Sequence, residues 1–126
     1  MIRILVVDDS AFIRKMLTST LTKFGVHKID EASDGYEAIQ LARTNNYNLI
    51  FMDIMMPKMD GIQSIKNIIM FNPEAKIVVC TSAGQEQVVS ESVKAGAKDV
   101  ITKPFEPELI KKILQKYLGQ DNNKGI

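Results

Sequence analysis

The fold is decided by the stretch Leu49-Ile50-Phe51-Met52-Asp53, in which four apolar residues lead directly into an acid. A continuous apolar run of this length is typical of a strand buried on both faces, as strands of parallel sheets are. Asp53 then lies where the strand leaves the sheet, and ligands of open α/β sheets bind just beyond these carboxyl ends. Pro57 and the pair Asp60-Gly61 predict a turn after the strand. The stretch therefore predicts a rigid central strand with one carboxylate at its end.

The size and composition of the chain limit the classes of protein to which it can belong. Its 126 residues are enough for one domain with a hydrophobic core and too few for two. The net charge is +1 and the Lys and Arg residues are scattered, so a nucleic acid is not predicted as a partner. No segment has the length of a transmembrane helix or the pattern of a signal peptide, so no membrane is predicted either. Cys80 is the only cysteine, which excludes a disulfide framework and fits a reducing cytoplasm.

Short apolar runs alternate with helical patterns along the chain. Apolar residues at helical spacing follow each run, and a helix stop such as Gly25 or Asn72-Pro73 ends several of these patterns. Five such units predict an α/β fold, in which a parallel sheet has helices on both faces and right-handed crossovers. Two strand orders are common in such doubly wound sheets, and we expect the flavodoxin-like (βα)5 order 2-1-3-4-5. The five predicted strands are residues 4–7, 28–32, 49–53, 76–81 and 99–102.

In that order, polar residues meet at the carboxyl ends of four neighbouring strands. Asp8 and Asp9 follow the first strand, Asp53 ends the third, Thr81 ends the fourth and Lys103 follows the fifth. Each of them alone has an ordinary explanation as a helix cap, a strand residue or a solvated lysine. Their common position at one edge of the sheet favours a binding site instead.

The residue types at this edge indicate a particular chemistry. Converging carboxylates stay ionised together only beside a cation or with shifted pKa values. Oxygen donors without His or Cys select a hard ion such as Mg²⁺, Mn²⁺ or Ca²⁺, and a site with few carboxylates suits Mg²⁺ best. Lys103 offers a positive charge and Thr81 a hydroxyl donor for phosphoryl oxygens. Together these are the parts that receive a phosphoryl group and hold it as an acyl phosphate.

Five motifs in a fixed order along the chain carry a resemblance to a known family. The motifs are Val6-Val7-Asp8-Asp9-Ser10, Met52-Asp53-Ile54-Met55-Met56-Pro57-Lys58-Met59-Asp60-Gly61, Cys80-Thr81-Ser82-Ala83, Ala95-Gly96-Ala97-Lys98-Asp99 and Lys103-Pro104-Phe105. With these motifs, residues 3–118 resemble a response-regulator receiver domain, and within that family the stand-alone receivers of chemotaxis. The resemblance implies a receiver domain at residues 1–119, and the polar composition of residues 120–126 predicts a flexible C-terminal tail.

The resemblance also implies roles for the residues that carry the chemistry. Asp53 is the phosphoacceptor by this resemblance. Mg²⁺, or Mn²⁺ in its place, is held by Asp8, Asp9, Asp53 and the backbone carbonyl of Met55. Lys103 contacts the phosphoryl group, and its peptide bond to the following proline is cis.

The implied switch and output residues are Thr81, Ser82, Val100 and Pro104. Thr81 supplies the switch hydroxyl in this reading. Val100 stands where receivers of this kind often carry Tyr or Phe, and a short β-branched side chain has little room to swing. We therefore expect the loop from Ser82 to Gln85 to relay the signal mainly by movement of its backbone.

The implied function is a phosphorylation-dependent, single-domain response regulator of a two-component system, with chemotaxis as the first choice of pathway. A phosphorelay intermediate or another stand-alone receiver is the alternative. The implied partners are a chemotaxis-type sensor histidine kinase, a downstream protein such as a flagellar motor switch protein, and a phosphatase, all in the cytoplasm. The chain would catalyse only its own Mg²⁺-dependent phosphotransfer and autodephosphorylation, and is otherwise not expected to be an enzyme.

Two other functions of similar sheets fit the sequence less well. An aspartyl-nucleophile phosphohydrolase of the haloacid dehalogenase type places an Asp-x-Asp motif after its first strand, where this chain has Asp8-Asp9-Ser10. A flavodoxin-like FMN carrier needs hydroxyls and free N–H groups in the same loop, and two acids there would repel its phosphate.

Overall fold

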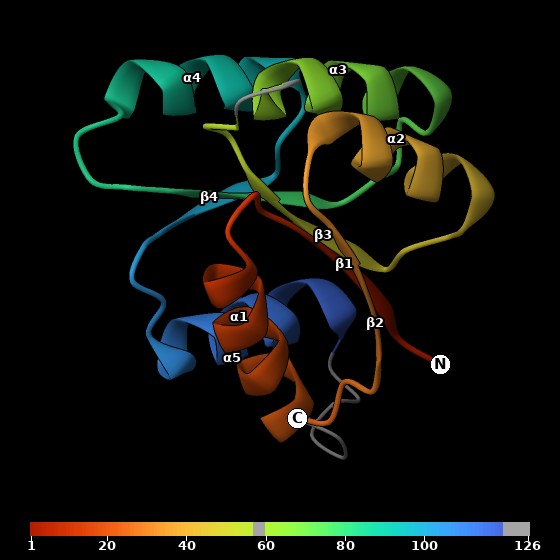
Figure 1. Ribbon diagram of the computed structural model, residues 1–126, viewed down its shortest axis with the longest axis vertical. Helices are drawn as coiled ribbons and strands as arrows, with labels where there is room; N and C mark the ends of the chain where they lie inside the picture. The colour runs from red at the N-terminus through yellow and green to blue at the C-terminus, as the bar shows by residue number, and fades with distance from the viewer. Residues whose placement is uncertain (57–59, 120–126) are drawn as a thin grey trace.

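The computed structural model describes residues 1–56 and 60–119, in which strand and helix alternate five times (Figure 1). The prediction of five strand–helix units is confirmed, whereas the predicted turn at Pro57 and the predicted tail at residues 120–126 lie outside the described residues. The strands are β1 (Arg3–Val7), β2 (Lys28–Ala32), β3 (Leu49–Asp53), β4 (Ile77–Thr81) and β5 (Asp99–Thr102). The helices are α1 (Ala11–Lys23), α2 (Gly35–Thr44), α3 (Gly61–Phe71), α4 (Glu86–Ala95) and α5 (Pro107–Leu118).

The five strands form one parallel sheet in the order β2-β1-β3-β4-β5, which confirms the expected strand order. β1 and β3 are neighbours, and Val7 pairs with Met52, so the residues that follow each of them start from adjacent strand ends. Thr81 pairs with Thr102 at the end of β4 and β5 in the same way. The carboxyl ends of four neighbouring strands therefore share one edge of the sheet.

Helices cover both faces of the sheet, with α1 and α5 on one side and α2, α3 and α4 on the other (Figure 1). All five residues of β3 are buried. Its alternate side chains pack into different layers, since Ile50 and Met52 join the core under α2 and α3 while Leu49 and Phe51 join the core under α1 and α5. This two-sided burial is the physical reason for the uninterrupted apolar run in the sequence.

Side-chain caps fix the starts of α1 and α3 next to this edge. The hydroxyl of Ser10 accepts a hydrogen bond of 3.2 Å from the N–H of Ile13 at the start of α1. The carboxylate of Asp60 accepts one of 2.9 Å from the N–H of Gln63 at the start of α3. Such caps satisfy backbone donors that have no partner inside the helix. None of the helices in the described ranges is both long and apolar enough to cross a bilayer.

Candidate functional site

Asp53 ends β3 and is almost completely buried, with 4% of its surface exposed. Its Oδ1 accepts a hydrogen bond of 3.2 Å from the backbone N–H of Met55 and lies 3.5 Å from Nζ of Lys103. Gly61 at the start of α3 packs on the same strand end, where an added Cβ would lie 2.5 Å from the carbonyl oxygen of Asp53. The loop, the lysine and the first residue of α3 together hold this residue in place.

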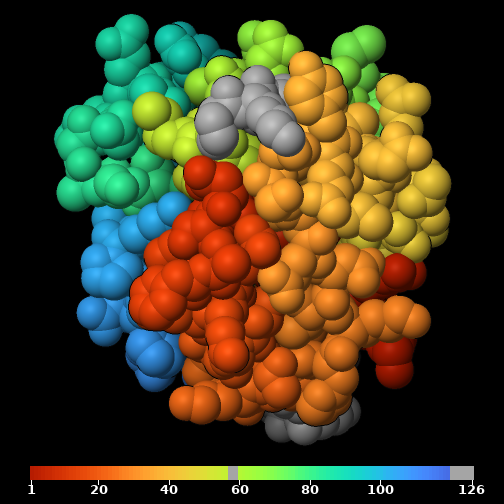
Figure 2. Space-filling model, viewed as in Figure 1, coloured from red at the N-terminus to blue at the C-terminus, as the bar shows by residue number. Residues whose placement is uncertain are grey.

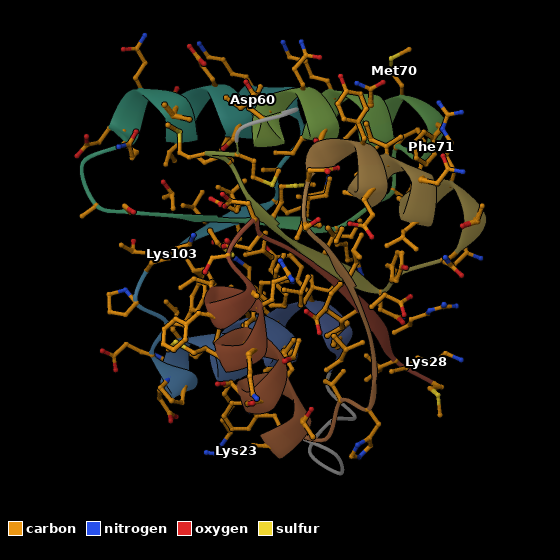
Figure 3. The ribbon with its side chains drawn as sticks, in the orientation of Figure 1. Lys23, Lys28, Asp60, Met70, Phe71 and Lys103 are labelled. Atoms are coloured by element: carbon orange, nitrogen blue, oxygen red, sulfur yellow. The ribbon has the colours of Figure 1, made fainter. Side chains whose placement is uncertain are left out.

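Asp8 and Asp9 follow β1, and the first of them is buried while the second is exposed. One carboxylate oxygen from each of Asp8, Asp9 and Asp53 lies within 4.8 Å of the other two. Asp8 accepts hydrogen bonds of 2.9 Å from the N–H of Ser10 and 2.8 Å from Nζ of Lys103. Lys103 lies between the two helical layers (Figure 3). Three carboxylates and one ammonium group thus meet at adjacent strand ends.

The electrostatic environment shifts two pKa values at this site. The pKa of the Asp53 carboxyl is raised to about 6, first by burial and second by the negative charge of Asp8, against the opposing charge of Lys103. Burial would lower the pKa of Lys103, but the hydrogen bond to Asp8 and the charge of Asp53 outweigh it and raise that pKa above its usual value. Lys103 therefore stays charged at neutral pH, whereas Asp53 loses its proton close to neutrality.

The donor set of this cluster fits a hard divalent cation. Three carboxylates face one ammonium group, which leaves an excess of negative charge. All the donors in the cluster are carboxylate oxygens, and such donors suit Mg²⁺ or Mn²⁺. Among the described residues, none donates a hydrogen bond to the carboxylate of Asp9. Met55 directs its N–H to Asp53, and its side chain is 58% exposed.

The predicted switch residues lie on the β4–β5 side of this cluster. Thr81 is buried at the end of β4, and its hydroxyl donates a hydrogen bond of 3.3 Å to the carbonyl of Ser82, which is exposed. The N–H of Lys103 donates to the carbonyl of Thr81 at 2.8 Å and so joins the ends of β4 and β5. Val100 lines a hollow of about 430 Å³ beside these residues, together with Thr81, Ser82 and residues of α4. Pro104 follows the lysine through a cis peptide bond, as expected.

Sequence reasoning missed one pair of residues next to the acids. Nη1 of Arg14 donates a hydrogen bond of 2.7 Å to the backbone carbonyl of Asp8, and its Nε donates one of 2.9 Å to Glu31. On the molecular surface, the N-terminal end of α1 lies between α2 and the segment that follows β5 (Figure 2). The sequence did contain a signal for Arg14. A positive charge near a helix N-terminus is disfavoured by the helix dipole, so its presence there indicates that the side chain has another role.

The comparisons with known proteins agree on one family. A model of the response regulator receiver domain matches residues 4–115. The chain is 46% identical over 114 residues to the chemotaxis protein CheY of Thermotoga maritima, an alignment that covers 90% of this chain and 95% of that protein. It is 40% identical over 117 residues to the chemotaxis protein CheY of Bacillus subtilis, with 93% and 98% of the two chains covered.

Solved structures give the same result. Chemotaxis protein CheY4 of Vibrio cholerae superposes with a TM-score of 0.85 at 33% identity and covers 93% of this chain and 98% of its own. A complex of CheX and CheY with BeF₃ and Mg²⁺ from Borrelia burgdorferi contains a chain that superposes with a TM-score of 0.87 at 35% identity. That match covers 94% of this chain and 90% of the other.

Proposed function

Because this chain belongs to the response regulator receiver domain family, we propose that it is a phosphorylation-dependent response regulator that accepts a phosphoryl group on Asp53 from a histidine kinase. The observation that carries the proposal is a buried carboxylate at the end of a central strand, with the ammonium group of Lys103 at 3.5 Å and two further acids close by. This arrangement holds a nucleophile and the charges that a phosphoryl group needs in one place.

The transfer step uses the ionised form of Asp53. A carboxylate oxygen of Asp53 forms a bond to phosphorus, while the bond from phosphorus to the donor nitrogen breaks and its electron pair stays on the donor. Lys103 already contacts both Asp8 and Asp53, so a small movement of its ammonium group brings it to a phosphoryl oxygen. Its positive charge then stabilises the charge on the transferred group.

The acids also provide the cation site that this chemistry needs. Asp8, Asp9, Asp53 and the backbone carbonyl of Met55 would hold Mg²⁺, with Mn²⁺ as a substitute. The bound ion supplies positive charge that offsets the repulsion between the carboxylates and the incoming phosphoryl group. Asp53 alone has a pKa of about 6, so a cation beside it would increase the fraction of ionised nucleophile at neutral pH.

The signal would leave the site through Thr81, Ser82, Val100 and Pro104. Phosphorylation adds about one further negative charge and three acceptor oxygens to Asp53. Thr81 lies at a neighbouring strand end, and its hydroxyl can exchange the carbonyl of Ser82 for a phosphoryl oxygen. We expect this exchange to draw the loop after Thr81 toward the site and so alter the surface that partners contact.

Chemotaxis is the pathway we propose, because the relatives from Thermotoga maritima and Bacillus subtilis are chemotaxis proteins. The partners would be a sensor histidine kinase, a downstream protein such as a flagellar motor switch protein, and a phosphatase, in the cytoplasm. A phosphorelay intermediate is the alternative. Affinity capture from a lysate with and without beryllium fluoride separates them, since recovered flagellar switch proteins support chemotaxis and a second kinase in their place contradicts it.

Labelling with acetyl phosphate tests the phosphoacceptor directly. With Mg²⁺ present, we expect the protein to take up one label per chain, and Asp53→Asn to abolish the labelling while the protein stays folded. Asp60→Asn is the matched control, because Asp60 is an exposed acid in the following loop and asparagine caps a helix about as well. An acid-stable label that persists on Asp53→Asn would point to a serine or threonine and overturn the assignment.

A further inference from the structure

An arginine side chain contacts the backbone of the loop that contains Asp8 and Asp9. Nη1 of Arg14 donates a hydrogen bond of 2.7 Å to the carbonyl of Asp8, and Nε donates one of 2.9 Å to Oε1 of Glu31 in β2. The side chain of Arg14 is mostly buried, whereas that of Glu31 is about half exposed. The two contacts explain why a cation stands close to the N-terminus of α1, where the helix dipole disfavours it.

The carbonyl that Arg14 holds belongs to the peptide group between Asp8 and Asp9. Because a peptide group is planar, fixing its oxygen also fixes the direction in which the chain enters Asp9. The other polar groups of Asp8 also have partners. Its N–H donates a hydrogen bond to the carbonyl of Ala32, and its carboxylate accepts hydrogen bonds from the N–H of Ser10 and from Nζ of Lys103.

Within the described residues, Asp9 has no comparable support of its own. Its side chain is exposed, and no residue within the ranges 1–56 and 60–119 donates a hydrogen bond to its carboxylate. That carboxylate nevertheless lies within 4.8 Å of those of Asp8 and Asp53. Among the described contacts, its position therefore depends on the backbone that leads into it, and Arg14 is the side chain that hydrogen-bonds this backbone.

We propose that Arg14, oriented by Glu31, is a positioning residue that fixes the Asp8–Asp9 peptide and so presents the carboxylate of Asp9 to a divalent cation. The inference rests on the proposed function, because it takes the acidic cluster as the Mg²⁺ site. A ligand that is already held in place loses less conformational freedom when the cation binds. Outer contacts that orient metal ligands commonly change metal affinity by about 10-fold to 100-fold.

The charge of Arg14 by itself predicts the opposite effect. A guanidinium group near the acids repels a divalent cation, so its removal should strengthen Mg²⁺ binding if charge were its only contribution. The positioning role predicts weaker binding after the same change. The sign of the change in affinity therefore separates the two explanations.

Titration of the folded protein with Mg²⁺, followed by amide NMR shifts, measures this sign. Arg14→Met keeps the apolar stem and removes the donors, and we expect affinity about tenfold weaker. Arg14→Lys keeps the charge and one donor, and we expect an intermediate loss. Arg3→Met is the matched control, because it breaks an ion pair of 3.0 Å to Asp30, also in β2, from the end of β1 that lies away from the acids. An affinity of Arg14→Met equal to or tighter than that of the wild type overturns the proposal.

Glu31→Ala tests whether Glu31 acts through Arg14. We expect a loss of affinity of several-fold alone and no additional loss when it is combined with Arg14→Met, because both changes release the same contact. A fully additive loss would mean that Glu31 acts through its own charge, and would overturn its orienting role. Backbone ¹⁵N relaxation of the ion-free protein adds a readout without metal. We expect lower order parameters at Asp9 and Ser10 in Arg14→Met, and unchanged values contradict the proposal.

Asp9→Ala distinguishes failure of this inference from failure of the proposed function. We expect it to lose most of the Mg²⁺ affinity, because too few charged oxygens remain. If Asp9→Ala binds Mg²⁺ like the wild type, the acidic cluster is not the cation site and the proposed function is wrong on that point. If Asp9→Ala loses binding while Arg14→Met keeps it, only the role of Arg14 is wrong. Arg14→Lys and Glu31→Ala carry the same test if Arg14→Met does not fold.

Discussion

As the proposed phosphoacceptor, Asp53 has to satisfy two opposed requirements. It would have to be ionised to act as a nucleophile, yet burial and the neighbouring charge of Asp8 raise its pKa to about 6 and so favour the protonated form. The positive charge of Lys103 opposes this shift and favours the ionised form of Asp53. Because the pKa of Lys103 is itself raised, Lys103 remains charged at neutral pH. In the absence of a divalent cation, the stability of the protein should therefore show a pH dependence that belongs to Asp53.

We expect the ion-free protein to lose stability as the pH rises through the pKa of Asp53. The folded pKa of about 6 lies above the usual value of 3.8, so the stabilising contribution is complete below pH 3.8 and is lost as the pH passes 6. The loss amounts to at most about 3 kcal/mol from this group. Urea unfolding in EDTA at pH 4 and pH 7.5 measures it, with Asp53→Asn as the reference that lacks the titrating group.

The comparison with Asp53→Asn is the decisive part of that measurement. The variant should be more stable than the wild type at pH 7.5 and gain little or nothing at pH 4, because asparagine is neutral at both values. A difference between the two proteins that does not change with pH would contradict the raised pKa of Asp53.

Single residues also show which features of the candidate site can be predicted from the sequence and which cannot. Asp8, Asp53 and Lys103 could be placed together because their positions follow from the strand order alone. The contact between the hydroxyl of Thr81 and the carbonyl of Ser82 could not be predicted, because rotation about one side-chain bond decides it. Arg14 was missed for a related reason: its place near the N-terminus of α1 indicates that it has a partner, but only the folded structure shows that the partners are Asp8 and Glu31.

At the scale of elements, the end of β3 and the start of α3 meet almost without side chains between them. The N–H of Gly61 donates a hydrogen bond of 3.2 Å to the carbonyl of Ile54. A Cβ at Gly61 would lie 2.5 Å from both the carbonyl oxygen of Asp53 and Cα of Ile54. The helix can approach the strand end this closely only because its first residue is glycine.

Gly61→Ala should therefore destabilise the protein although helix propensity favours alanine by up to about 1 kcal/mol. The added methyl group meets backbone that can yield only if Asp53 moves, and we expect a net loss of about 1–3 kcal/mol together with slower labelling by acetyl phosphate. Urea unfolding and the labelling rate measure the two effects. Gln63→Ala, an exposed change in the same helical turn, is the control and should alter neither. Unchanged stability of Gly61→Ala would show that the strand end has room to adjust.

The elements themselves were the most predictable part of the molecule. The apolar runs of β1, β3 and β4 and the stops at Gly25 and Asn72 follow from local rules that the packed structure also obeys. Two layers of helices can pack on one sheet only if the apolar residues occupy the positions that these runs give them. The geometry between elements, such as the approach of α3 to β3, depends on contacts far apart in the sequence and had to come from the structure.

Across the whole molecule, the loop between β4 and α4 stands out as a weakly anchored connection beside the site. The side chain of Gln85 makes no capping hydrogen bond at the start of α4, in contrast to Ser10 and Asp60 at the starts of α1 and α3. Ser82 to Gly84 are exposed, and Gly84 has a φ of 86° with no atom within 4 Å of an added Cβ. The hollow of about 430 Å³ beside Val100 leaves space into which this loop can move.

These properties lead to a prediction about how phosphorylation reaches the surface. When the hydroxyl of Thr81 turns to the phosphoryl group, the carbonyl of Ser82 loses its donor, and the loop must find a new position. We therefore expect amide hydrogen exchange between Thr81 and Ser92 to change when beryllium fluoride and Mg²⁺ are added. Thr81→Ala should still be labelled but should lose most of this change, whereas Val100→Ala should keep it, because a short side chain contributes little movement. Exchange that changes only in the loop after Asp53 would contradict a relay through the backbone of the β4–α4 loop.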